Sequence, residues 1–212
     1  MSERIGTIPG TVIHEGRVKS SASEVVVLKG VTSGEVEVKT SGLVVATCGG
    51  SSVPQSDPIC YQAQKLAVGV VARGGVLVNG GENGGIALTI TEAEESATLH
   101  VACPYHEVIH FGQKAMVNSY QTRKLIVTVM PVVVVFPGKV GTLDELMTAL
   151  GWIKSLLHQN AEPPKLWVHE FWWDVLELLN HKGAIQPGVW EKLHRFTDAD
   201  QILATLATAG TG

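Results

Sequence analysis

The stretch Val132-Val-Val-Val-Phe-Pro-Gly-Lys-Val-Gly-Thr-Leu-Asp-Glu145 decides the fold of this chain. Its five leading apolar residues end at Pro137-Gly138, which predicts a short strand buried on both faces. A helical pattern follows, and Thr142 with Glu145 three residues later predicts an N-cap and a capping box. The strand therefore brings a glycine-rich turn and a helix N-terminus to one point, and backbone N–H groups at such a point attract anions.

Strands and helices alternate on both sides of this stretch, from Gly42 onward. The alternation predicts an α/β fold, a Rossmann-like doubly wound parallel sheet with helices on both faces. Such sheets bind ligands at the carboxyl ends of their strands. Strands are predicted over residues 43–48, 76–78, 98–103, 132–136 and 165–168, and helices over 58–73, 93–97, 115–129, 142–157, 171–179 and 198–207.

Residues 1–41 have a different pattern from residues 42–212 and are predicted to form a separate N-terminal β-rich extension. Apolar and polar residues alternate over 11–14, 24–28 and 34–39, with turn residues between these segments. This pattern predicts a small antiparallel β arm. Its role is left open between covering a sheet edge and forming an oligomer interface.

The composition excludes several functional classes. The chain has 212 residues, of which 45% are hydrophobic and 17% charged, and this balance is typical of a globular domain with a large core. The net charge of −4 and the pI of about 6.0 give no support for nucleic-acid or membrane binding. The start of the chain lacks an apolar signal core. The isolated Cys48, Cys60 and Cys103 are predicted to be reduced core thiols, so we expect a cytoplasmic protein.

The decisive stretch also resembles a known family. Pro137–Glu145 is similar to the P-G-G-x-G-T-x-x-E signature of the LOG (Lonely Guy) family, cytokinin riboside 5′-monophosphate phosphoribohydrolases that were long described as lysine decarboxylases. Gln121-Thr-Arg-Lys124 resembles the M-x-x-R-K element that precedes this signature, and the segments His181–Ile185 and Thr197–Leu203 follow the family layout. The resemblance covers roughly residues 42–208 and implies a nucleotide site with no cofactor and no metal, in a homodimer or higher oligomer.

The resemblance also implies roles for individual residues. Arg123 and Glu145 would be the catalytic pair, and Lys124 with residues 139–145 would line the nucleotide. From the residues alone, Glu145 is equally well explained as a capping residue, and Arg123-Lys124 is better explained as a solvated pair on a helix. The phosphate is expected at three glycine-rich turns, through Gly49, Gly50, Ser51, Gly80, Gly81, Gly138, Lys139, Gly141 and Thr142.

The implied chemistry is the hydrolysis of a nucleoside 5′-monophosphate, such as AMP, to a free base and ribose 5-phosphate. Cleavage of the N-glycosidic bond gives the ribose oxocarbenium character, which a carboxylate stabilises while it directs a water molecule. A carboxylate in the first turn of a helix is expected to stay ionised, because the helix dipole favours negative charge there. A guanidinium group and backbone N–H groups would hold the phosphate.

Several positions depart from the family pattern. Lys139 occupies the second glycine of the signature, and Asn79–Ile86 replaces the usual G-G-G-x-x-G-L-M-G turn. A threonine of the family corresponds to Gly151, and Glu107 is the one candidate for the glutamate that would face the base. These departures favour an alternative, a non-hydrolytic nucleotide or molybdenum-cofactor (molybdopterin) carrier on the same fold. A third possibility is an inactive scaffold.

Three further motifs have structural explanations. His106-Glu-Val-Ile-His110 matches the H-E-x-x-H zinc motif, but it follows Cys103-Pro104 in a short, β-branched segment, so we predict a loop beside the nucleotide site. The aromatic residues Trp167 and Phe171–Trp173 are predicted to pack the last helices onto the sheet rather than to stack on a base. Asp198 and Asp200 are predicted to begin a helix.

Overall fold

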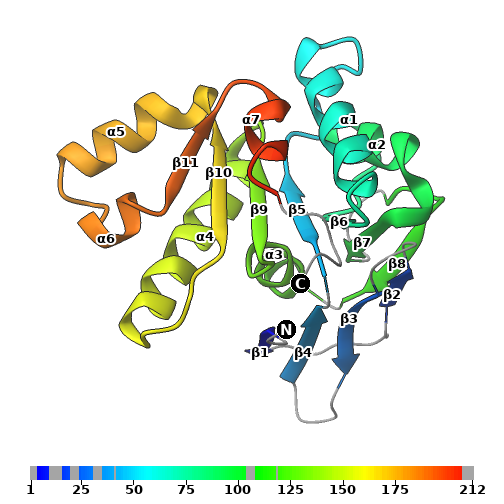
Figure 1. Cartoon of the computed structure of the whole chain (residues 1–212), viewed down its shortest axis with the longest axis horizontal. Helices are drawn as coiled ribbons and strands as arrows, with labels where there is room; N and C mark the ends of the chain where they lie inside the picture. Colours follow the sequence, from blue (N-terminus) through cyan, green and yellow to red (C-terminus); the bar gives the residue numbers. More distant parts are fainter. Residues whose placement is uncertain are drawn as a thin grey trace.

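A seven-stranded parallel sheet forms the centre of the protein (Figure 1). The computed structural model describes residues 4–9, 16–19, 24–30, 35–40, 42–103, 108–117 and 119–206. The strand order is β11-β10-β9-β5-β6-β7-β8, so the order reverses between β5 and β9. The strands are β5 (Val44–Cys48), β6 (Val76–Asn79), β7 (Thr98–Ala102), β8 (Gln113–Met116), β9 (Val132–Val135), β10 (Lys165–His169) and β11 (Leu193–Phe196).

Helices cover both faces of this sheet, which confirms the predicted doubly wound α/β fold. One face packs against α1 (Pro58–Val71), α2 (Gly85–Ala93) and α7 (Ala199–Leu203). The other face packs against α3 (Tyr120–Thr128), α4 (Val140–His158), α5 (Trp173–His181) and α6 (Pro187–Trp190). Every residue of β5, β6, β7 and β9 is buried, as expected for parallel strands enclosed between two helical layers.

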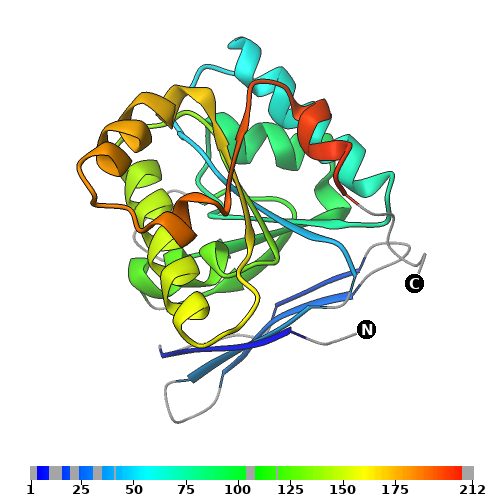
Figure 2. The same cartoon turned by 60° about the vertical axis from the view of Figure 1, so that its left-hand side comes forward.

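The N-terminal segment forms a separate four-stranded antiparallel sheet, which lies below the main sheet in Figure 2. Its strands are β1 (Arg4–Pro9), β2 (Gly16–Lys19), β3 (Glu24–Gly30) and β4 (Glu35–Thr40), in the order β1-β4-β3-β2. The predicted β arm is thus confirmed. β3 and β4 lie where the alternating pattern predicted strands, whereas β1 and β2 were not predicted. The predicted strand at 11–14 lies outside the described residues. β2 lies next to β8, at the edge of the main sheet.

Two of the predicted helices, at 115–129 and 93–97, differ from the structure. The helix predicted over 115–129 is β8 followed by α3, because β8 is an edge strand with one buried residue, Ala115, and so has little apolar alternation to recognise. The helix predicted over 93–97 is α2, which ends at Ala93, followed by the short 3₁₀ helix η1 (Glu95–Ala97). α2 begins at Gly85, where helix propensity is poor. The helix α6 and the strand β11 were not predicted.

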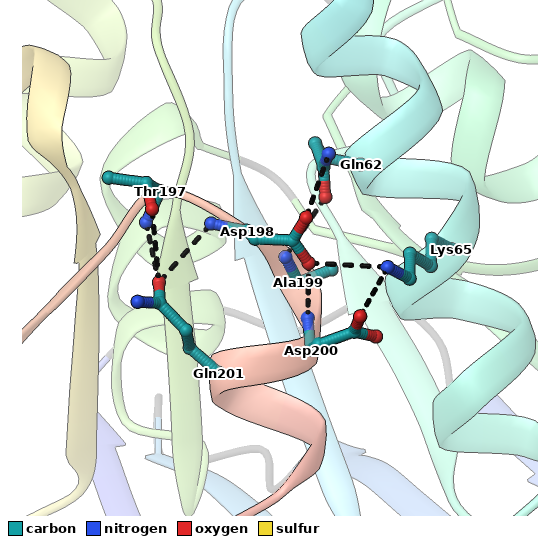
Figure 3. A network of polar contacts seen from close by, with 7 residues as sticks. All are labelled: Gln62, Lys65, Thr197, Asp198, Ala199, Asp200 and Gln201. Carbon is teal, nitrogen blue, oxygen red and sulfur yellow. Dashed lines mark hydrogen bonds and ion pairs between the residues drawn. The ribbon is translucent and has the colours of Figure 1, made fainter.

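The last helix begins as the sequence predicted. Asp198 is the N-cap of α7, and its side chain forms a capping box with Gln201. Lys65 on α1 pairs with both Asp198 and Asp200, which fixes α7 against α1 (Figure 3). Asp198 and Asp200 therefore have structural partners that account for them.

Trp167 and Trp172 pack as predicted and the cysteines are buried, whereas the prediction is wrong for Phe171. Trp172, in the 3₁₀ helix η2 (Glu170–Trp172), is buried, and its Nε1 donates to the carbonyl of Phe136 at 2.9 Å. Trp167 is buried in β10, whereas Phe171 is exposed. Cys48, Cys60 and Cys103 are buried free thiols, as predicted. Among the helices of the described residues, none is both long and apolar enough to cross a membrane.

Candidate active site

Three loops meet at the carboxyl edge of the sheet, where the strand order reverses. The backbone N–H of Gly50, after β5, donates to the carbonyl of Pro137, after β9, at 2.9 Å. The carbonyl of Gly50 accepts from the N–H of Ile86, in the first turn of α2, at 3.3 Å. A Cβ on Gly138 would lie 2.9 Å from the nitrogen of Gly50, so the loops approach too closely there for a side chain.

The helix after β9 begins two residues earlier than predicted. Lys139 is the N-cap of α4 in an extended conformation, and its carbonyl accepts from the N–H of Leu143 at 3.1 Å. Thr142 therefore lies inside the first turn, and the predicted capping box between Thr142 and Glu145 is wrong. No side chain caps this end of α4, so its leading N–H groups remain available to an anion.

A cavity of about 180 Å³ lies at this junction. Its inner wall is buried and includes Thr47, Cys48 and Glu145, whereas Ser52 and Lys139 at its rim are exposed. Most of the predicted site residues line it, namely Gly49, Gly50, Ser51, Gly80, Arg123, Lys139, Gly141, Thr142 and Glu145.

The other predicted residues lie outside the cavity lining. Lys124 is buried, and its Nζ donates to the Asp144 carboxylate at 2.7 Å. Gly81 has a positive φ of 68°, and its N–H donates to the side chain of Asn79. Gly138 packs beneath the rim against the loop after β5. In the structure Gly81 and Gly138 shape the loops around the cavity, whereas Lys124 joins α3 to α4.

Arg123 is a buried ion-pair partner rather than a solvated surface cation. Its Nη1 donates to the carbonyl of Gly80 at 2.9 Å, and its Nη2 lies 3.3 Å from Glu82 Oε1 and 3.6 Å from Glu145 Oε1. The guanidinium carbon lies 4.7 Å from the centre of the Tyr120 ring. One cation is thus shared between two carboxylates, which raises the pKa of Arg123 although burial lowers it.

Glu145 differs from the expected permanently ionised carboxylate. Burial raises its pKa to about 7, and the nearby Arg123 cation offsets only part of that increase. Because the residue lies in the second turn of α4, the helix terminus contributes less than it would in the first turn. The neighbouring Cys48 thiol also lowers the pKa of Glu145. Near neutral pH, Glu145 can therefore either accept or give up a proton.

Sequence reasoning missed several residues of the cavity. Glu82 and Tyr120 line it, from the turn after β6 and from the start of α3. Thr47 Oγ1 and Arg123 Nε are buried beside it, and neither has a hydrogen-bond partner among the described residues. Of these missed residues, Glu82 could have been found from the sequence, because it is a charged residue inside the glycine-rich run 80–85.

A buried polar network holds the turn after β6. His100 Nδ1 lies 2.7 Å from Asn79 Oδ1, and the same oxygen accepts from the N–H of Gly81 at 2.9 Å. Burial lowers the pKa of His100 to about 4, so this imidazole stays neutral at physiological pH. The network supports the backbone that carries Gly80 and Glu82 into the cavity wall.

The zinc-like motif has no metal cluster around it in the described residues. His106 and Glu107, the latter also proposed to face the base, lie outside those residues, and His110 is exposed. Across residues 42–103, 108–117 and 119–206, no three His, Cys, Asp or Glu side chains are grouped so that they could hold a metal ion. Gly151 lies on α4, and a Cβ there would meet no atom within 4 Å.

Solved structures of low sequence identity share this fold. The molybdenum cofactor carrier protein from Chlamydomonas reinhardtii is 15% identical with a TM-score of 0.57, and the match covers 77% of this chain and 94% of that one. The molybdenum cofactor binding protein from Rippkaea orientalis is 20% identical with a TM-score of 0.55, at the same coverage. DNA processing protein A from Helicobacter pylori, which binds single-stranded DNA, is 16% identical with a TM-score of 0.54, over 78% of this chain and 80% of that one.

Sequence comparison identifies the family. The sequence matches none of the curated proteins with which it was compared. The model of a family described as "possible lysine decarboxylase" matches residues 68–206, a range that contains Arg123, Lys139 and Glu145. The family model agrees with the LOG resemblance, and the molybdenum cofactor proteins share the fold. The chain therefore belongs to the possible lysine decarboxylase family.

Proposed function

We propose that this protein hydrolyses the N-glycosidic bond of a nucleoside 5′-monophosphate and releases a free base and ribose 5-phosphate. The observation that carries the proposal is Glu145, a buried acid with a pKa of about 7 that lines the cavity. The uncapped N-terminus of α4 borders the same cavity. Retention of a phosphorylated ligand needs only the helix N-terminus, whereas glycoside hydrolysis also needs an acid or base near the sugar.

The rim of the cavity suits a phosphate group. Lys139 is exposed there at the N-cap of α4, and Gly141 follows in the first turn. Among the described residues, no carboxylate lies within ion-pair distance of the Lys139 amine. A phosphate bound at this rim would receive backbone N–H groups, the helix dipole and one side-chain cation.

The inner wall suits the sugar. When the bond between C1′ and the base nitrogen breaks, its electron pair leaves with the base and C1′ acquires oxocarbenium character. The ionised Glu145 stabilises that charge and accepts a proton from the water whose oxygen adds to C1′. The departing base takes a proton from solvent, which balances the reaction. Arg123 keeps the carboxylate in place through the 3.6 Å contact.

A second candidate is a non-hydrolytic carrier of a phosphorylated ligand such as a nucleotide or molybdopterin. Lys139 favours it, because a flexible cation at the rim strengthens the retention of a phosphate without contributing to bond cleavage. Two similar structures are molybdenum cofactor carrier or binding proteins, although at 15% and 20% identity they share no more than the fold. In either role we propose a cytoplasmic homodimer, an assembly that rests on the LOG resemblance.

Release of ribose 5-phosphate decides between the two candidates. The protein is incubated with AMP and, separately, with a cytokinin riboside 5′-monophosphate, and the product is quantified. Glu145→Gln should abolish the release of ribose 5-phosphate, although the glutamine side chain has nearly the same size and shape. Glu170→Gln is the matched control, because Glu170 pairs with Arg195 at the surface and should leave activity unchanged. Absence of product from both substrates, with tight binding of a pterin phosphate, would establish the carrier. Full activity of Glu145→Gln would refute the proposed mechanism.

A further inference from the structure

Glu82 gives the cavity a second carboxylate that the proposed hydrolysis does not use. Its side chain is 30% exposed and lines the cavity, and its Oε1 lies 3.3 Å from Nη2 of Arg123. Glu145 Oε1 lies 3.6 Å from the same nitrogen, so the two carboxylates face one shared cation. A single guanidinium cannot neutralise both of them when both are ionised.

The backbone holds Glu82 firmly in this position. Its carbonyl accepts from the N–H of Gly84 at 2.9 Å, and Glu82 forms a β-bridge with Val108. The carbonyl of the preceding Gly81 accepts from the N–H of Ile109 at 2.9 Å. With the Asn79 network on its other side, the turn presents a pre-organised carboxylate, which loses little freedom when a ligand binds.

The chemistry of this carboxylate restricts what can bind beside it. An ionised carboxylate accepts hydrogen bonds and donates none, and it repels a phosphate. The cavity is therefore polarised: Lys139 and the α4 N-terminus attract an anion at the rim, whereas Glu82 and Glu145 favour hydrogen-bond donors. A ligand that fits both parts has a phosphate at one end and hydroxyl groups a few bonds away, as a ribose 5-phosphate moiety does.

We propose that Glu82 accepts a hydrogen bond from a ribose hydroxyl of the bound nucleotide and so makes the site selective for ribonucleotides over deoxyribonucleotides. This inference rests on the proposed nucleotide site, but it does not require that the site be catalytic. A site built to hydrogen-bond a hydroxyl group binds the analogue that lacks it more weakly, because the hydrogen bond to the carboxylate is lost. Glu82 is thus a specificity-determining residue rather than part of the bond-breaking step.

Calorimetric dissociation constants for AMP, 2′-deoxy-AMP and 3′-deoxy-AMP test this role. The wild-type protein should bind AMP roughly tenfold to hundredfold more tightly than at least one of the deoxy analogues. Glu82→Ala should bring that ratio close to one. Glu82→Gln, whose amide oxygen still accepts a weaker hydrogen bond, should give an intermediate ratio. Glu92→Ala is the control, because Glu92 is an exposed carboxylate bonded to Gln55 outside the cavity lining.

The ratio of the dissociation constants of a deoxy analogue and AMP distinguishes recognition of the sugar from structural damage. If Glu82 merely holds Arg123 in place, its loss weakens all three nucleotides alike, the ratio stays at its wild-type value, and the inference is overturned. It is equally overturned if the wild-type protein binds AMP and both deoxy analogues with the same affinity, or binds none of them. The proposed hydrolysis is judged separately, by the release of ribose 5-phosphate from wild-type protein, so either idea can fail while the other stands.

Discussion

The raised pKa of Glu145 predicts that the folded protein loses stability as pH rises from about 5 to about 8. The folded protein holds the Glu145 proton up to about pH 7, whereas an unfolded chain releases it near the ordinary value of 4.5. Between these values the folded state binds more protons than the unfolded state, so the free energy of unfolding falls with increasing pH. The difference between 4.5 and about 7 corresponds to on the order of 3 kcal/mol. About 2.5 kcal/mol of this falls between pH 5 and pH 8.

Urea unfolding of wild-type protein and Glu145→Gln, each at about pH 5 and about pH 8, measures this contribution. The glutamine cannot ionise, so the variant should lose about 2.5 kcal/mol less stability than the wild type over that interval. Histidines titrate in the same range, but they are common to both proteins and cancel in the comparison. The control Glu170→Gln should follow the wild type. An equal pH dependence in wild type and Glu145→Gln would refute a raised pKa at this residue.

Three further substitutions have defined outcomes. Gly138→Ala should destabilise the fold by about 2 kcal/mol in urea unfolding, since its Cβ would lie 2.9 Å from a backbone nitrogen; Gly141→Ala, whose Cβ meets only a tyrosine hydroxyl at 3.6 Å, is the matched control and should cost far less. Trp172→Phe should also cost about 2 kcal/mol, because the buried Phe136 carbonyl loses its donor, and unchanged stability would show that water replaces the indole. Lys139→Gly should weaken AMP binding roughly threefold at low salt and less at high salt; a loss independent of salt would exclude a screened phosphate contact.

Short-range sequence signals predicted most of the sheet. The apolar run at 132–136 predicted β9 because a strand enclosed between helical layers needs apolar residues at every position. The edge strands β8 and β11 lack such a run and were missed: half of the residues in β11, His194 and Arg195, are exposed. An edge strand depends on pairing with one neighbouring strand, and the order of residues in the sequence does not show which strands will pair.

The candidate site was only partly predictable for a similar reason. The glycine-rich turns and the signature stretch identified the loops, and most of the residues chosen from them line one cavity. The start of α4 was placed wrongly because Thr142 has a good capping side chain, whereas the structure uses the backbone of Lys139. The burial of Glu145 depends on α3, α4 and β5 coming together, so its raised pKa follows from tertiary packing rather than from helix position.

The interlocked loops around Gly50 have a consequence for how such a site can diverge. Gly50 and Gly138 lack side chains because they press on one another's backbone, and Gly85 presses on the Gly50 carbonyl, so substitution there disrupts the scaffold whatever the ligand. Lys139 and Glu82, by contrast, carry side chains that line the cavity. Substitutions at Lys139 and Glu82 can therefore change which ligand fits while the backbone of the loops stays in place. The glycines are required by the contacts between the loops and not by the ligand.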